Sequence, residues 1–97
     1  MVSHIGARAF YDCPIVPEVL YLRASVDQYA FAYDDTIYSV IFVDGSNLTI
    51  ANNAFYGCSN LRNLNMNKRV GYIGESAFDC TDIITTQYLI NYMKTHE

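Results

Sequence analysis

The side chains that could support nucleophilic catalysis or bind a metal are few in this chain and stand far apart. The 97 residues include three cysteines and two histidines: Cys13, Cys58, Cys80, His4 and His96. A nucleophilic cysteine needs a histidine beside it as a base, and both histidines lie near the termini, where chains tend to fray. The cysteines also lack the Cys-x-x-Cys spacing of a zinc site. The sequence therefore predicts a protein that is not an enzyme and that holds neither a metal nor a cofactor.

Adjacent carboxylates at Asp34 and Asp35 are the remaining candidates for acid–base chemistry. We expect Asp34 instead to accept backbone hydrogen bonds in a turn, a common role for aspartate. Residues 44–47, Asp-Gly-Ser-Asn, predict another turn and lack the ligand spacing of a calcium loop. These patterns favour binding over catalysis as the activity of the chain.

Composition and charge narrow the class of partner. Apolar residues make up 52% of the chain and charged residues 16%, which excludes a charge-rich disordered tail because the chain can build a core. The net charge of −4 excludes the basic footprint of a nucleic-acid-binding protein. No apolar run reaches the ~20 residues that span a bilayer, and the N-terminus lacks the pattern of a secretory signal. We expect a cytoplasmic protein, or the mature fragment of a surface protein, that binds a protein and contacts neither nucleic acid nor membrane.

An internal repeat organises the elements that must position any binding residues. Four of the five phenylalanines directly follow an alanine, at intervals of 21, 24 and 23 residues: Ala9-Phe10, Ala30-Phe31, Ala54-Phe55 and Ala77-Phe78. A β-branched apolar residue lies four positions before each of these alanines: Ile5, Val26, Ile50 and Ile73. Three copies have a cysteine shortly after the phenylalanine, and the second copy has Asp34 at that place. The copies divide a single domain, residues 1–97, into repeats of about 5–25, 26–49, 50–72 and 73–97.

The third copy of this repeat resembles the BspA-like class of leucine-rich repeat. Its sequence is Ile50-Ala51-Asn52-Asn53-Ala54-Phe55-Tyr56-Gly57-Cys58-Ser59-Asn60-Leu61. The resemblance extends from residue 5 to about residue 88. It implies a scaffold for adhesion or partner recognition, because repeat arrays of this class serve varied functions on one fold.

A repeat of about 23 residues with apolar anchors is typical of one coil in a stacked solenoid. We expect an α/β solenoid of about four coils, a short leucine-rich-repeat stack. Parallel strands would form one side of it, and short helical turns around each Ala-Phe pair would form the other. The phenylalanine rings would then lie one above the other in a buried column.

The two ends of the stack are expected to differ. The segment Ile83-Ile84-Thr85-Thr86 favours a fourth strand because of its β-branched residues. Tyr88, Leu89, Tyr92 and Met93 share one stripe of a helix, which predicts a C-terminal capping helix after that strand. Nothing comparable precedes the first repeat, so its strand edge and the neighbourhood of Phe10 should lie open.

The partner-binding residues are predicted from the strand positions that alternate with the buried anchors. Those expected to face outward are Glu18, Leu20, Leu22, Tyr38, Ile41, Val43, Arg62 and Asn65. Together they would form an apolar patch with a polar rim, as interfaces often do. Residues 19–22 and 40–43 are apolar on both faces, so a slip of one residue would turn different apolar side chains outward.

The sequence therefore predicts a non-enzymatic module that binds a protein through its concave strand face. One alternative is a small acidic phage-type inhibitor that blocks a larger nucleic-acid-processing or defence complex. A second alternative is a structural fragment of a surface adhesin. Homo-oligomers could form through the uncapped ends or through the apolar strand face.

Overall fold

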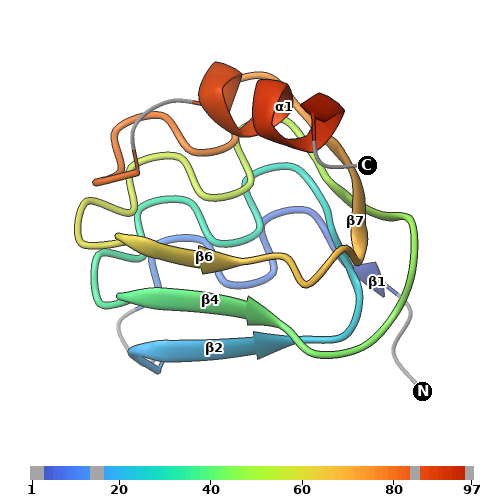
Figure 1. Ribbon diagram of the computed structural model, residues 1–97. Coiled ribbons are helices and arrows are strands. Elements are labelled where there is room, and N and C mark those ends of the chain that lie inside the picture. The colour runs from blue at the N-terminus through green and yellow to red at the C-terminus, as the bar shows by residue number, and fades with distance from the viewer. Residues whose placement is uncertain (1–3, 14–16, 84–85, 96–97) are drawn as a thin grey trace.

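Two parallel sheets and one helix make up the structure, a computed structural model that describes residues 4–13, 17–83 and 86–95 (Figure 1). Within these ranges the elements are β1 (His4–Ile5), β2 (Val19–Leu22), β3 (Ser25–Val26), β4 (Ser39–Phe42), β5 (Leu48–Ile50), β6 (Asn63–Asn65), β7 (Val70–Ile73) and α1 (Thr86–Thr95). The four-strand sheet has the order β1-β3-β5-β7, and the three-strand sheet has the order β2-β4-β6. Consecutive strands along the chain therefore alternate between the two sheets.

The four-strand sheet is built on the β-branched position of the repeat. Ile5 pairs with Val26, Val26 with Ile50, and Ile50 with Ile73, all in parallel register. The last three of these residues are at most 3% exposed. The sequence predicted this column of anchors but not the sheet that carries it, because two of its strands are only two residues long.

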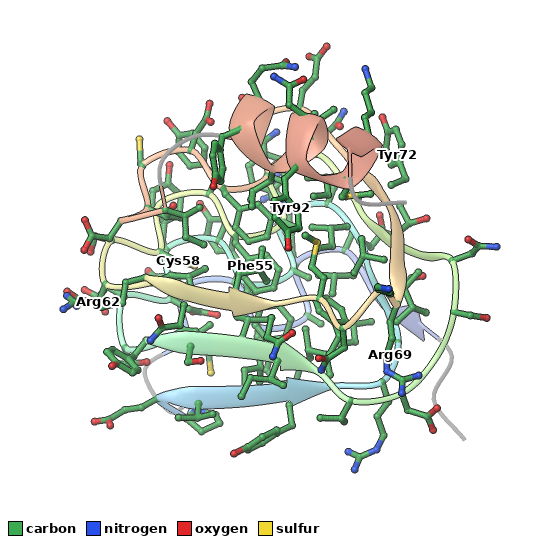
Figure 2. The ribbon with its side chains drawn as sticks, viewed as in Figure 1. Phe55, Cys58, Arg62, Arg69, Tyr72 and Tyr92 are labelled. Atoms are coloured by element: carbon green, nitrogen blue, oxygen red, sulfur yellow. The ribbon has the colours of Figure 1, made fainter. Side chains whose placement is uncertain are left out.

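The predicted phenylalanine column is confirmed. Phe10, Phe31, Phe55 and Phe78 lie in a row, with successive ring centroids 5.1, 5.3 and 5.2 Å apart and interplanar angles of 7° or less. This spacing is close to the ~4.8 Å between paired strands, so the rings follow the strands from one copy to the next. Phe55 is fully buried in the middle of the column (Figure 2), whereas Phe10 at its first end is 43% exposed.

The segments around the Ala-Phe pairs are turns, and the helical turns predicted there are wrong. The amide of each phenylalanine donates to the alanine carbonyl of the next copy, from Phe10 to Ala30, Phe31 to Ala54 and Phe55 to Ala77, at 2.7–2.9 Å. Residues on both sides of each pair have positive φ: Arg8 and Asp12, Tyr29 and Tyr33, Asn53 and Gly57, Ser76 and Cys80. A right-handed helix cannot continue through a left-handed residue. The turns therefore bond to their neighbours in the next copy, much as strands do.

The predicted capping helix is present as α1, which packs against β7 at the last end of the stack (Figure 1). Leu89 is 7% exposed, and Ile90 and Met93 pack partly buried against the same core. The predicted stripe is half right, because Tyr88 and Tyr92 are 50% and 44% exposed.

The strand predicted to precede this helix is wrong where the structure describes it. Ile83 lies in a bend, α1 begins at Thr86, and residues 84 and 85 fall outside the described ranges. The β-branched residues favoured a strand, but residues 89, 90 and 93 have helical spacing and bury one helix face. Among the described residues, no helix has the length and apolar character needed to cross a lipid bilayer.

Candidate functional site

The outward side of the three-strand sheet is the surface on which most of the predicted site residues lie. Parallel register places Val19, Ser39 and Asn63 in one row, and Tyr21, Ile41 and Asn65 in the next. Leu22, Val40 and Phe42 are buried in the core, so the alternating residues between them face the other way. We call the outward residues Val19, Tyr21, Ile41, Asn63 and Asn65 the strand face. Tyr21 is its large exposed hydrophobic side chain, with 59% of its surface exposed.

The prediction that Leu20 and Leu22 face outward is wrong. They pair with Val40 and Phe42. Leu22 is 3% exposed, and Leu20 packs partly buried against the core. The physical reason is one extra residue in the first copy: Tyr21 follows Phe10 by 11 positions, whereas Ile41 follows Phe31 by 10. The register of β2 is set by the burial of the two leucines. Counting the same number of positions from the phenylalanine, as in the second copy, therefore gives the wrong outward residues in the first copy.

The predicted residues Glu18, Tyr38 and Arg62 come together at the beginning of the three-strand sheet. Each residue directly precedes a strand of this sheet, and backbone hydrogen bonds join them. The N–H of Tyr38 donates to Glu18 O at 2.7 Å, and the N–H of Arg62 donates to Tyr38 O at 3.1 Å. They line an open pocket of about 340 Å³ together with Thr36 and Asn60. We call these five residues the strand-entry pocket.

Opposite charges and an aromatic ring share this pocket. The Arg62 guanidinium lies 5.5 Å from the centre of the Tyr38 ring, a cation–π contact. Arg62 Nε is also 3.8 Å from Asp82 Oδ2, and both side chains are more than half exposed. An ion pair so exposed contributes little to stability, so Arg62 can exchange Asp82 for a carboxylate on another molecule. Figure 2 shows Arg62 at the start of β6, projecting away from the core.

The remaining predicted residues are distributed around this surface. Ile41 and Asn65 belong to the strand face, and Val43 follows β4, half-buried, with its N–H donating to Leu22 O at 2.9 Å. Sequence reasoning missed Val19 and Tyr21 because residues 19–22 are apolar on both faces. It also missed Thr36 and Asn60, whose positions outside the strands follow no alternation.

Asp34 replaces the cysteine of the repeat and is 1% exposed. Its Oδ1 accepts a 2.6 Å hydrogen bond from the Cys13 N–H, so the predicted acceptor role is confirmed, but the donor lies in the first copy and not in the turn of Asp34 itself. Burial raises the pKa of its carboxyl from 3.8 to about 6. The Cys13 hydrogen bond opposes this rise, and the charges of Asp12 and Asp35 add to it. The carboxyl is therefore a buried structural group that holds its proton to a higher pH than a carboxyl in water, and it is mostly ionised above pH 6.

Stability should fall as the pH rises through the titration of Asp34. The pKa of Asp34 is higher in the folded chain than in the unfolded chain, so its contribution is complete below about pH 4 and is lost as the pH passes 6. We expect Asp34→Asn, which keeps an acceptor for Cys13, to melt several degrees above wild type at pH 7.5. The difference should shrink below pH 4. Melting curves from pH 3.5 to 8 would measure it, and a constant difference across that range would refute the assignment.

The three cysteines differ in exposure: Cys58 is buried, Cys13 is partly buried and Cys80 is exposed. Cys13, Cys58 and Cys80 are all free thiols. Cys58 is buried, donates to Phe31 O at 3.0 Å, and has a pKa raised to about 12 by its burial. A thiol with so high a pKa stays protonated and is a poor nucleophile. No cluster of three or more His, Cys, Asp or Glu side chains suited to a metal ion occurs within the described ranges.

Comparison with known proteins gives one match. A family model described as BspA type leucine rich repeat region (6 copies) matches residues 24–96. The search of curated proteins and the search of solved structures returned no match. The matched range contains the second, third and fourth copies of the Ala-Phe motif, and it includes β4, β6 and α1.

Proposed function

This chain belongs to the BspA-type leucine-rich repeat family, and from that premise we propose that it binds a protein partner through the strand face and the strand-entry pocket. Repeats of this family generally mediate protein–protein interaction and generally lack enzymatic activity. We further propose that residues 1–97 form one solenoid domain of four coils, the last of which ends in α1. The alternation of the two sheets and the phenylalanine column support this arrangement.

The observation that carries the binding proposal is the exposed apolar surface beside charged groups. Tyr21 and Ile41 are neighbours across two paired strands, and Tyr21 is mostly exposed. Tyrosine and arginine are enriched at the energetic centres of interfaces. The surface thus combines an apolar centre with a pocket that holds one carboxylate and one guanidinium.

Charge in the pocket would fix the orientation of the partner. Glu18 and Arg62 carry opposite charges on either side of Tyr38. A partner with a basic group for Glu18 and an acidic group for Arg62 would bind in one orientation and be repelled in the reverse one. The apolar contacts would supply most of the affinity.

Affinity capture from a lysate of the source organism tests this face. We expect Tyr21→Ser combined with Ile41→Asp to reduce the captured partner at least about tenfold, because both changes remove apolar contact at the centre of the face. Tyr72→Ser is the matched control. Tyr72 is 57% exposed, close to the value for Tyr21, but it lies on β7 in the other sheet (Figure 2).

The pattern of capture separates the outcomes. Equal capture by wild type and by the double variant would refute the strand face. Loss with Tyr72→Ser alone would move the interface to the four-strand sheet. Capture that disappears in about 0.5 M salt would favour the acidic inhibitor, since exposed charges are screened at that ionic strength. Capture that persists in salt favours the apolar face proposed here.

A further inference from the structure

The two sheets differ in strand number at the end covered by α1. The four-strand sheet continues to β7, whereas the three-strand sheet stops at β6. Phe55 and Phe78 are 23 residues apart, and adding 23 to the bounds of β6 gives residues 86–88, which begin α1. The helix therefore takes the residues that the repeat would use for a fourth strand. Among the described strands, β6 pairs with β4 and with no other.

The backbone of β6 presents hydrogen-bonding groups at this free edge. The N–H of Asn63 donates to Tyr38 O, toward β4. Backbone groups of successive residues point to opposite edges of a strand, so the N–H and C=O of Leu64 point away from β4. An exposed strand edge is a template for one more strand.

A groove lies along this edge, between β6 and α1. It encloses about 850 Å³, and its apolar lining includes Leu64, Met66, Leu89 and Met93. Figure 2 shows Tyr92 projecting from α1 into the space above β6. A strand added to β6 would alternate its side chains between this apolar lining and the outside.

Charge identifies the chemistry of the occupant. Of the described residues that line the groove, Lys68 alone is charged. The chain as a whole has a net charge of −4, so a basic side chain with no acidic neighbour in the lining is a local exception. An occupant with a carboxylate near Lys68 would complement it.

We propose that an extended acidic segment of a partner protein adds to β6 as a fourth strand of the three-strand sheet. Its backbone pairs with the free edge at Leu64. Its alternate apolar side chains fill the groove against Met66 and Leu89, and an Asp or Glu side chain pairs with Lys68. This mode of recognition draws its affinity from main-chain hydrogen bonds and its specificity from the side-chain pockets. The site shares Asn65 with the strand face, and its other lining residues lie outside that face.

Selection from a display library of linear ten-residue peptides against the whole chain tests the proposal. The enriched peptides should alternate apolar residues and carry one acidic residue. Fluorescence polarisation with the best labelled peptide should show binding about tenfold weaker for Lys68→Glu and an intermediate loss for Lys68→Gln. Methylation of alternate backbone amides of the peptide should abolish binding, whereas methylation of the intervening amides should preserve it.

Controls locate the peptide and exclude other occupants. Chemical-shift changes should fall on residues 64–66 and on Leu89, and the Tyr21→Ser, Ile41→Asp variant should bind the peptide as wild type does. Three results would overturn the proposal: no enriched peptide, equal binding by Lys68→Glu, or shifts confined to Val19, Tyr21 and Ile41. A dimer in sedimentation that the peptide disrupts would identify a second copy of the chain as the occupant and would also overturn it.

Discussion

Replacing Phe55 with alanine is expected to lower the free energy of unfolding by about 3–5 kcal/mol, the usual cost of deleting a core aromatic side chain. Phe55 is fully buried and stacks on two rings, Phe31 at 5.3 Å and Phe78 at 5.2 Å. A void at this place would remove contacts on both of its sides. A domain of this size has about 5–15 kcal/mol of stability in total, so the variant should unfold early in a urea titration.

Phe10→Ala is the matched control for this prediction. Phe10 belongs to the same column but stacks on Phe31 alone and is 43% exposed. Its loss should cost no more than about half as much, since much of its surface already contacts water. Equal destabilisation by the two substitutions would contradict the assignment of Phe55 to the buried middle of the column and of Phe10 to its exposed end.

Replacing Gly74 with alanine should have the second largest effect, a loss of about 1–3 kcal/mol, as overpacked sites typically show. Gly74 follows the buried Ile73, and its N–H donates to Ile50 O at 2.7 Å. A Cβ at this position would lie 2.5 Å from Asn52 N and 2.8 Å from the carbonyl carbon of Ala51. Backbone atoms cannot move aside cheaply, so the turns of the third and fourth copies would have to separate.

Gly6→Ala supplies the control, because Gly6 holds the same position in the first copy. A Cβ on Gly6 would meet no atom within 4 Å. Thermal melts of the two variants should therefore differ, with Gly6→Ala close to wild type. Should both variants melt with the wild type, the close approach at Gly74 would be disproved.

The parts of the fold that the repeat specifies could be predicted from the sequence. The phenylalanines and the β-branched anchors recur every 21–24 residues and align in space as expected. Asp34, at the cysteine position of the second copy, accepts a backbone hydrogen bond as expected. Helix α1 could be predicted because several apolar residues lie three to four positions apart. In each case one face of a repeating element must be buried, which leaves a periodic trace in the sequence.

The remaining features leave no such trace. Strands of two residues, such as Ser25–Val26, are too short to show alternation. The turns at each Ala-Phe pair depend on left-handed torsion angles, which polar residues of many types can adopt. The register of β2 was missed because its inward and outward residues are all apolar. Only packing in the folded protein shows that Leu20 faces the core and Tyr21 faces outward.

Several individual residues of the candidate site could be predicted from the sequence, but their arrangement in one pocket could not. Glu18, Tyr38 and Arg62 were predicted from positions that alternate with the buried anchors, and each lies directly before a strand. Their convergence on one pocket follows from the backbone hydrogen bonds that join them. Asn60 was missed because its role comes from a tertiary contact, a 2.6 Å hydrogen bond from its side chain to Asp35 O.

The left-handed residues beside each Ala-Phe pair bear on how such a repeat can diverge. Arginine, tyrosine, asparagine and serine occupy the same position in the four copies, and within the described ranges no residue with positive φ is valine, isoleucine or threonine. Side chains that branch at Cβ are strongly disfavoured at positive φ. Mutation can therefore vary the side chain at these positions while avoiding the three β-branched residues and proline, whose ring fixes φ at about −65°. Degenerate copies in other chains should be recognisable by that avoidance even after the alanine and phenylalanine have been lost.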